Sequence, residues 1–236
     1  REKAGVFRPD CVAIIGEPDL PLSITEYANQ LHTTLYRVGH EFNYQKDQTQ
    51  PALWHFESAL QSYAGLTVPR LRLANAASVV ALLSHIWPQI SQQHINQGLQ
   101  QAQLAGRLEQ VSQLPLVLLD VAHNPHAARY LAQQLQAYQG RRIVALCGML
   151  KDKDIKSVLA TLAEQISHWN LVSLDNPRGA SAQTLRQALP NDGSREHVSE
   201  FADIASAWQA IQATVNADDV VIVFGSFYTV AGFKSL

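Results

Sequence analysis

The sequence has few cysteines, no strong charge of one sign and no long apolar run. Its two cysteines, Cys11 and Cys147, lie far apart and show no metal-ligand spacing, so they argue against a disulfide framework and a cysteine zinc site. We interpret both as buried thiols of a protein in a reducing compartment, the cytoplasm. The formal net charge is −2, and no apolar run reaches the roughly 18 residues of a membrane span. We therefore expect no nucleic-acid partner and no membrane partner.

A phosphate-binding loop of the form G-x-x-x-x-G-K-[ST] is also missing, although the 236 residues include 12 glycines. The chain starts at Arg1 without a methionine, and residues 1–8 are similar to the interior of a longer sequence. We therefore expect a fragment. Its hydrophobic content of 47% is sufficient for one large core or two ordinary ones.

The chain has two regions of different texture. In the first, short strands and helices follow each other without a regular repeat: we predict strands at 11–15, 33–38, 42–44 and 53–56, and helices at 24–31, 73–87 and 91–103. From residue 114, strands at 114–120, 142–147, 169–174 and 219–225 alternate with helices near 125–138, 153–166, 181–189 and 201–215. This alternation predicts an α/β domain with a parallel or mixed sheet between two layers of helices. The boundary between the regions should fall within residues 107–113.

The segment from Asp120 to Pro125 places polar groups where a buried strand ends and a helix begins. Residues 114–119 are continuously apolar apart from a proline, which is typical of a parallel strand covered on both faces. Asn124 followed by Pro125 is a helix start, with asparagine at the N-cap and proline at the first helical position. We therefore expect Asp120 and His123 at the carboxyl end of a strand, where α/β proteins bind ligands.

Six motifs then occur in a characteristic order: Glu2–Pro9, Asn75–Ala77, Gly106–Arg107, Asp120–Pro125, Gly148–Asp154 and Gly225–Val230. Together they closely resemble the bacterial folylpolyglutamate synthase/dihydrofolate synthase family of the Mur ligase superfamily. The resemblance implies that residues 1–108 are the C-terminal part of the central ATP-binding domain. It also implies that residues 109–236 are the C-terminal Rossmann-like, glutamate ligase domain with a mostly parallel sheet.

The same resemblance implies an activity. Members of this family are ATP-dependent amide ligases that add L-glutamate to dihydropteroate, giving dihydrofolate, and to the γ-carboxylate of tetrahydrofolate polyglutamates, through an acyl phosphate. It implies ATP and Mg²⁺ as cofactors, with K⁺ or another monovalent cation as a further candidate, small-molecule partners and a monomer. The family carries its phosphate loop upstream of where this sequence starts, so we predict that residues 1–236 alone are inactive. Two alternatives remain: a Mur-type ligase with another carboxylate acceptor, and a non-enzymatic nucleotide-binding module.

Three candidate residues precede the regular region. By resemblance Lys3 is a carbamylated lysine that acts in catalysis as a Mg²⁺ ligand, and the alternative is a solvated lysine beside Glu2. Asn75 stands in an apolar helical pattern, where it is either a buried amide that binds ATP, as the resemblance implies, or a helix N-cap. Arg107 follows a glycine that we expect to be flexible, so that its guanidinium can reach ATP phosphate oxygens. The family has Pro-Gly-Arg here, and Ala105 replaces the proline.

Asp120 and His123 are the sharpest candidates. A carboxylate at a strand end can accept a hydrogen bond from a ribose hydroxyl, and the resemblance makes Asp120 an ATP-binding residue. We expect His123 to be catalytic, facing the phosphates, with a histidine bonded to a loop carbonyl as the alternative. The spacing of Asp120, His123 and His126 is also compatible with a zinc site, which we consider the weaker interpretation.

The remaining candidates are turns that follow predicted strands. Lys151–Asp154 contains either helix-start acids and solvated lysines or residues that face the ligand. Asn176–Gly179 is a turn at a strand exit. Ser226 and Tyr228, at the end of the last predicted strand, are candidates for contact with the amino-acid substrate.

Overall fold

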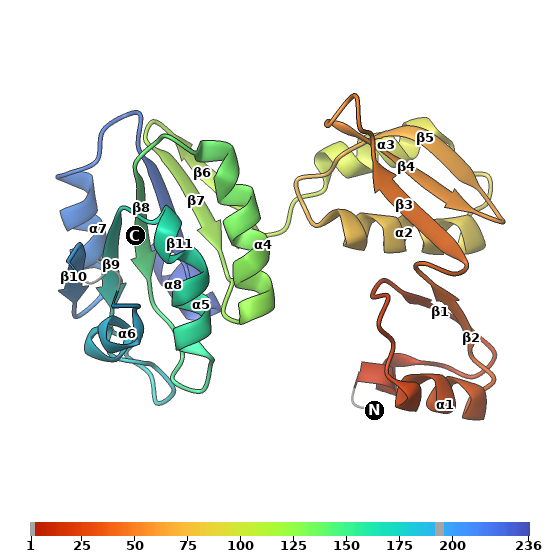
Figure 1. Cartoon of the computed structure of the whole chain (residues 1–236), viewed down its shortest axis with the longest axis horizontal. Helices are drawn as coiled ribbons and strands as arrows, with labels where there is room; N and C mark the ends of the chain where they lie inside the picture. The colour runs from red at the N-terminus through yellow and green to blue at the C-terminus, as the bar shows by residue number, and fades with distance from the viewer. Residues whose placement is uncertain (1–2, 192–195) are drawn as a thin grey trace. The chain divides into compact units, whose positions relative to one another are not determined.

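The computed structural model describes residues 3–191 and 196–236, and it divides the chain into two compact units between Gln103 and Leu104 (Figure 1). The division precedes the expected boundary at 108/109. Residues 104–108 belong to the second unit because the Gly106 carbonyl accepts a hydrogen bond from Val121 N at 2.8 Å. The next residues, Glu109–Gln113, form strand β6 of the second unit.

The first unit contains two small sheets and their helices. Its elements are η1 (Lys3–Val6), β1 (Val12–Ile15), α1 (Leu22–Gln30), β2 (Thr34–Arg37), β3 (Phe42–Lys46), β4 (Leu53–Ser58), β5 (Ser62–Thr67), α2 (Leu73–Ile86) and α3 (Gln92–Gln101). Strands β1 and β2 pair in parallel, and β3, β4 and β5 form an antiparallel sheet. Helices α2 and α3 cover that sheet because Val80 and Ile95 pack on its aromatic face, which includes Trp54 and Phe56. The expected strands and helices of this region are confirmed, and β5 is an additional strand.

The two cysteines differ in exposure. Cys147 is fully buried at the end of β8 (Ile143–Cys147), and burial raises the pKa of its thiol. Cys11 is exposed, so the expectation that both thiols are buried is wrong for Cys11. The reason is local: Cys11 directly precedes β1, whose sheet has only two strands and whose first residue, Val12, is itself exposed.

The second unit is built on one six-stranded sheet. The strand order is β10-β9-β8-β11-β7-β6, with β7 at Leu116–Asp120, β9 at His168–Val172, β10 at Val198–Phe201 and β11 at Val220–Phe224. All neighbours pair in parallel except β6, which is antiparallel to β7. This confirms the mostly parallel α/β sheet. The strands at its two edges were not predicted, because β6 and β10 have one neighbour each and lack the fully buried pattern of β7, β8 and β11.

Helices cover both faces of this sheet (Figure 1). On one face α4 (Pro125–Leu135), α5 (Ile155–Leu162) and α6 (Ala182–Ala188) pack against residues such as Leu118 and Phe224. On the other face α7 (Ile204–Gln212) and α8 (Phe227–Lys234) pack against residues such as Leu119 and Val223. Successive strand residues thus face opposite cores, which explains why these strands are continuously apolar. Helix α8 was not predicted. No described helix is long and apolar enough to cross a membrane.

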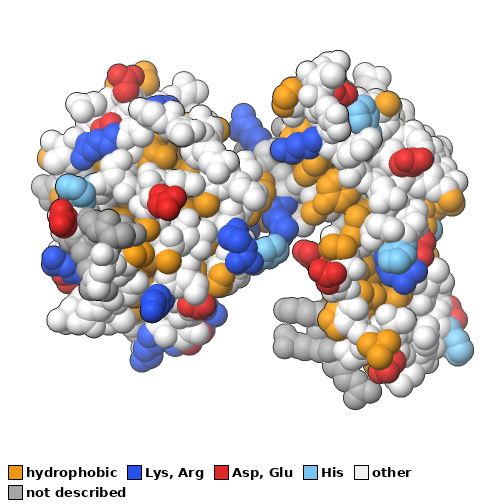
Figure 2. All heavy atoms as spheres, in the orientation of Figure 1, with side chains coloured by type: hydrophobic (Ala, Val, Ile, Leu, Met, Phe, Trp, Pro, Cys, Tyr) orange, Lys and Arg blue, Asp and Glu red, His pale blue; other side chains and the backbone are white. Residues whose placement is uncertain are grey.

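On the face of the protein drawn in Figure 2, basic and acidic side chains are interspersed and form no single large field of one sign. This distribution agrees with the formal net charge of −2.

Candidate functional site

The central strands of the second unit create a switch point at their carboxyl ends. Strand β11 lies between β7 and β8. The chain leaves β7 and β8 towards the face covered by α4 and α5, whereas it leaves β11 towards the opposite face, covered by α8. In open α/β sheets, ligands bind at such a point because the diverging connections leave room between them. Arg107, Asp120, His123 and Phe227 lie in this region of the second unit.

Asp120 ends β7 and is only 7% exposed. Its Oδ2 accepts a hydrogen bond from Leu108 N at 2.9 Å, and its Oδ1 accepts one from Ala122 N at 2.8 Å. Burial raises the pKa of this carboxyl above its ordinary value, while the two amide donors and the nearby charges of Arg107 and His123 oppose that rise. The carboxylate therefore fixes the backbone on both sides of the strand end. Each oxygen keeps a second lone pair, and the predicted bond to a ribose hydroxyl stays a prediction.

The turn that carries Arg107 is held by its backbone. Gly106 has a φ of +66° and Leu108 a φ of +48°, so both residues that flank Arg107 are in the left-handed region. That region is unfavourable for leucine, and the bond from Leu108 N to Asp120 helps to hold it there. Gly106 N donates to Glu109 Oε2 at 2.8 Å. Gly106 is thus required for the conformation of the turn and is bonded at both its N–H and its carbonyl, and the expected flexibility of this glycine stays a prediction.

Helix α8 holds the same turn from two points. Lys234, its last residue, donates from Nζ to Glu109 Oε1 at 2.7 Å. Phe227, its first residue, presents its ring to Arg107, whose Cζ lies 5.4 Å from the ring centroid. The Arg107 side chain itself is exposed. The structure therefore offers a solvent-accessible guanidinium on a well-anchored turn.

His123 is half-buried and has a defined orientation. Its Nδ1 lies 2.7 Å from the carbonyl oxygen of Val121. A carbonyl only accepts, so Nδ1 carries the hydrogen and Nε2 is left to accept a hydrogen bond or to take up a proton. The alternative of a histidine bonded to a loop carbonyl is thus confirmed, and this bond also directs Nε2. The catalytic role of His123 stays a prediction.

Ser226 and Tyr228 have different environments. Ser226 is buried and is the N-cap of α8, where its Oγ accepts from Thr229 N at 3.0 Å and lies 2.7 Å from Thr229 Oγ1. Thr229 Oγ1 donates to the Gly148 carbonyl at 2.6 Å, which joins the ends of β8 and β11. Tyr228 is 54% exposed. The substrate contacts of Ser226 and Tyr228 stay predictions, and the cap leaves Ser226 little free bonding capacity.

The two turn candidates lie together. Asp152 accepts from Arg178 Nη2 at 2.8 Å, and Lys151 N donates to the Arg178 carbonyl at 2.8 Å. The bond from Arg178 is the largest cause that lowers the Asp152 pKa, to about 2. Asp154 is the N-cap of α5 through Ser157 N. The charges of Asp152, Asp154 and Arg178 therefore serve the local structure. At the start of α4, Asn124 is the N-cap as predicted, because its side chain accepts a hydrogen bond from Ala127 N.

Asn75 lies in the first unit, in the first turn of α2, and both interpretations of its environment are wrong. Arg72 is the N-cap residue of α2, and the Asn75 side chain is exposed rather than buried. The apolar pattern gave a misleading signal because Asn75 lies beside the buried face, at the positions of Ala76 and Ala77, and not on it. Its predicted contact with ATP stays a prediction.

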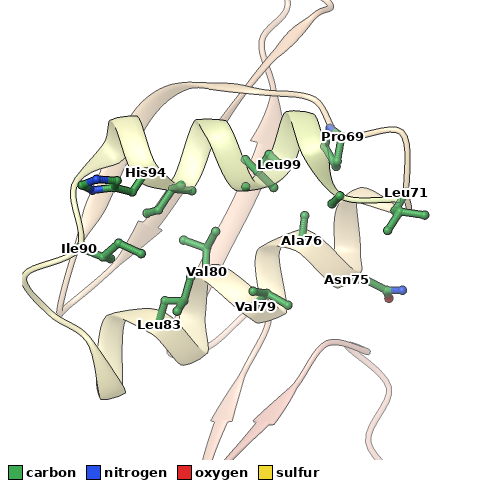
Figure 3. A pocket seen from close by; sticks show the side chains of 13 residues that line it. Pro69, Leu71, Asn75, Ala76, Val79, Val80, Leu83, Ile90, His94 and Leu99 are labelled. Atoms are coloured by element: carbon green, nitrogen blue, oxygen red, sulfur yellow. The ribbon is translucent and has the colours of Figure 1, made fainter. Parts of the chain in front are cut away.

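A groove of about 350 Å³ lies between α2 and α3, and Asn75 and His94 belong to its lining (Figure 3). The rest of the lining is mainly aliphatic, including Val79, Val80 and Leu99. Its apolar character gives no anchor for a phosphate.

The metal candidates receive no geometric support. The Lys3 backbone starts η1, but its side chain lies outside the described residues. Within residues 3–191 and 196–236, no three histidine, cysteine or acidic side chains gather as a metal site. His123 Nδ1 is hydrogen-bonded to the Val121 carbonyl. The zinc interpretation of Asp120, His123 and His126 therefore receives no support from the structure.

Phe227, Leu108, Glu109 and Thr229 were missed by sequence reasoning. A signal existed for the first of them: Gly225-Ser226 after an apolar strand is a helix start, and it would have placed Phe227 at the beginning of a helix.

The family described as "Mur ligase, glutamate ligase domain" matches residues 106–227, which is more than half of the chain. The chain belongs to the Mur ligase family. The matched stretch of this Mur ligase chain begins at the Arg107 turn and ends at Phe227, so it includes Arg107, Asp120, His123 and Ser226.

Similar proteins extend the match to the first unit. The Mur ligase chain is 40% identical over 232 residues to the dihydrofolate synthase/folylpolyglutamate synthase of Escherichia coli (strain K12), covering 98% of this chain and 53% of that protein. A structure of the bifunctional folylpolyglutamate synthase/dihydrofolate synthase from Yersinia pestis, complexed with AMPPNP and Mn ion, has a TM-score of 0.88 at 42% identity and covers 99% of this chain and 55% of that one. E. coli FolC in complex with DHPP and ADP has a TM-score of 0.89 at 38% identity, with 99% and 55% covered. The sequence resemblance is thus confirmed, and the chain spans about half the length of the relatives it matches.

Proposed function

We propose that this Mur ligase chain is the part of a dihydrofolate synthase/folylpolyglutamate synthase that contributes Arg107, Asp120 and His123 to ATP-dependent glutamate ligation. The observation that carries the proposal is the position of these three side chains at the carboxyl ends of parallel strands, at a topological switch point. The matched relatives support it, because they bear that name and include structures with AMPPNP or ADP. The domain assignment, with residues 1–108 from the central ATP-binding domain and 109–236 as the C-terminal domain, is part of the proposal.

Each residue has a role that follows from its contacts. Asp120 fixes the Arg107 turn by accepting a hydrogen bond from Leu108 N. Its remaining lone pairs can accept a hydrogen bond from a ribose hydroxyl. Arg107 offers a planar set of donors to phosphate oxygens from an anchored turn. His123 directs Nε2 away from its carbonyl partner, and its protonated form offsets negative charge that develops on the transferred phosphoryl group.

The reaction that we propose joins the amino group of L-glutamate to an acyl phosphate of dihydropteroate or of a tetrahydrofolate polyglutamate. ATP supplies the phosphoryl group that activates the carboxylate. Asn75 is proposed to contact ATP, and Ser226 and Tyr228 to contact the amino acid. Among the described residues, no three histidine, cysteine or acidic side chains gather as a metal site, so we assign the chain no step that depends on an ion. Carbamylation of Lys3 stays a prediction.

The test is carried out on the product of the complete reading frame that encodes residues 1–236. We expect ADP release that depends on both L-glutamate and dihydropteroate, and then on tetrahydrofolate as the second acceptor. Residues 1–236 alone should release no ADP under these conditions. Glutamate-dependent ADP release with another carboxylate acceptor, and none with either pterin, would favour a Mur-type ligase with another acceptor. Nucleotide binding without any ligation would favour a binding module.

Arg107→Ala tests the assignment of the site. Removing a charge-assisted bond to phosphate costs about 1.5–3 kcal/mol, so the KM for ATP should rise by about tenfold or more. Arg107→Lys keeps the charge but lacks the planar set of donors, so its KM for ATP should lie between those of the wild type and of Arg107→Ala. Arg129→Ala on α4 removes another exposed arginine, which lies outside the site, and serves as the control. Equal KM values for ATP in all four proteins would refute the role of Arg107.

We also propose that the ligase works as a cytoplasmic monomer. Light scattering of the purified protein tests the oligomeric state, and a mass of twice the chain mass would contradict it.

A further inference from the structure

Phe227 is an exposed aromatic side chain whose position is fixed by its backbone. It is 59% exposed, although a phenyl ring gains free energy from burial. The preceding Gly225 has a φ of +112°, and a Cβ there would lie 2.5 Å from the Gly148 carbonyl oxygen. Ser226 then caps α8 by accepting from Thr229 N. The two residues before Phe227 therefore leave the start of α8 little freedom, so the ring occupies a defined place at the end of β11.

The ring has two functional neighbours. The Cζ atom of Arg107 lies over it, 5.4 Å from the centroid, within the range of a cation–π interaction. The His123 ring is the second neighbour, with the ring centroids 6.5 Å apart and an interplanar angle of 48°. Phe227 thus contacts both Arg107, which precedes β7 in the sequence, and His123, which follows β7.

An aromatic partner differs from an acidic one in a way that matters for phosphate binding. In the described part of the chain, no carboxylate lies within ion-pair distance of Arg107. Its guanidinium donates a long hydrogen bond of 3.4 Å to the Gly106 carbonyl. A carboxylate would neutralise the guanidinium and would have to be displaced by a phosphate. A ring restricts the rotamers of the arginine, yet it leaves the charge and the in-plane N–H donors available.

We propose that Phe227 is a positioning residue, which holds the Arg107 guanidinium at the ends of β7 and β11 so that its donors are ready for the phosphate oxygens of a nucleotide. The proposal deepens the proposed function and rests on it. Phe227 itself needs no contact with the nucleotide: it acts through Arg107 by reducing the rotamer freedom that is lost on binding.

The first experiment uses residues 1–236 without any nucleotide. The Arg107 Nε–Hε group is followed by NMR in the wild-type chain, in Phe227→Leu and in Phe227→Tyr. We expect an ordered, ring-shifted Arg107 signal in the wild type and in Phe227→Tyr, and a mobile signal near the random-coil position in Phe227→Leu. Tyr138→Leu is the matched control, because Tyr138 stacks with Arg141 at 6.0 Å in the same unit and should not affect Arg107. An unchanged Arg107 signal in Phe227→Leu would overturn the proposal.

The second experiment measures steady-state kinetics in the product of the complete reading frame. Phe227→Leu should raise the KM for ATP by about two- to fivefold, as expected for an exposed cation–π pair, without changing the KM for glutamate. Phe227→Tyr should restore the wild-type value. In an Arg107→Ala background, Phe227→Leu should have no further effect, because the residue acts only through Arg107.

The outcomes separate the two proposals. If Phe227→Leu raises the KM for ATP equally in the Arg107→Ala background, the ring contacts the nucleotide or serves only the local structure, and the positioning role is overturned. If the wild-type protein shows no ATP-dependent ligation, the proposed function fails. In that case the NMR comparison still decides whether the ring holds Arg107.

Discussion

Gly106→Ala is expected to destabilise the second unit and to displace the Arg107 turn. Gly106 has a φ of +66°, and a Cβ at this position would lie 2.8 Å from Val121 Cγ1 and 3.4 Å from Val230 Cγ1. The matched control is Gly140→Ala in the same unit. Gly140 has a φ of +90°, and a Cβ there would meet no atom within 4 Å. The two substitutions share the conformational cost and differ in the steric one.

The magnitude follows from three contributions. Placing an L-residue in the left-handed region costs about 1–2 kcal/mol at either position. Alanine also restricts the unfolded chain, which returns about 0.4–1 kcal/mol at either position. Only at Gly106 does the new methyl group approach a carbon far inside the optimal contact distance of about 3.5–4.0 Å, and such overpacking costs about 1–3 kcal/mol. We therefore expect Gly106→Ala to destabilise the unit by about 1–3 kcal/mol more than Gly140→Ala.

Native-state hydrogen exchange measures this difference within one unit of a two-unit chain. The slowest amides of β7 and β11 report the free energy of unfolding of the second unit, because both strands are fully buried. Equal losses in the two variants would refute the reasoning, since they would mean that Val121 and Val230 accommodate the methyl group without cost. A larger loss of unfolding free energy in Gly140→Ala than in Gly106→Ala would refute it as well.

Two further predictions concern the end of β7. Asp120→Asn removes one of the two acceptors for Leu108 N and Ala122 N and should cost about 1–3 kcal/mol. Because burial raises the folded-state pKa of Asp120 above its ordinary value of 3.8, the folded state holds this proton more tightly than the unfolded state. The contribution of Asp120 to wild-type stability therefore falls as the pH rises from 3.8 through the folded-state pKa. The deficit of Asp120→Asn, measured by urea unfolding, should therefore shrink over that window, and a deficit that grows with pH would contradict the raised pKa. Asn124→Ala removes the N-cap of α4 and should cost about 1 kcal/mol, whereas Asn124→Ser should retain most of that stability; identical hydrogen exchange in α4 for all three proteins would refute the cap.

The sequence predicted the central part of the fold well and its edges poorly. Strands β7, β8 and β11 are buried on both faces, so their apolar runs identify them without any knowledge of their partners. Strands β6 and β10 contain polar residues because each lies at an edge, and their strand conformation depends on pairing with β7 and β9. Helix α8 follows β11 after two residues, and its N-cap Ser226 stands so close to the apolar strand that the pattern indicates a strand end there.

For the candidate site, local patterns were informative about position and misleading about environment. The strand end and helix start of the Asp120–Pro125 motif are visible in the sequence, because capping and apolar runs are local properties. The exposure of Asn75 is not visible, since a shift of one residue around a helix moves a side chain from the buried face to solvent. The bond that holds the Gly106 carbonyl is equally invisible in the sequence, because its donor, Val121 N, lies 15 residues further along the chain.

The sequence by itself determined that Asp120 and His123 stand at the end of a buried strand and that the chain resembles a folate ligase. Only the tertiary structure decided that Asp120 anchors the turn before β7, that Asp152 pairs with Arg178, and that the Phe227 ring lies beside Arg107. The physical reason is the range of the interactions. Helix caps and apolar periodicity act over a few neighbouring residues, whereas the contact between Phe227 and Arg107 exists because β11 is inserted between β7 and β8, and no pattern in either segment encodes that order.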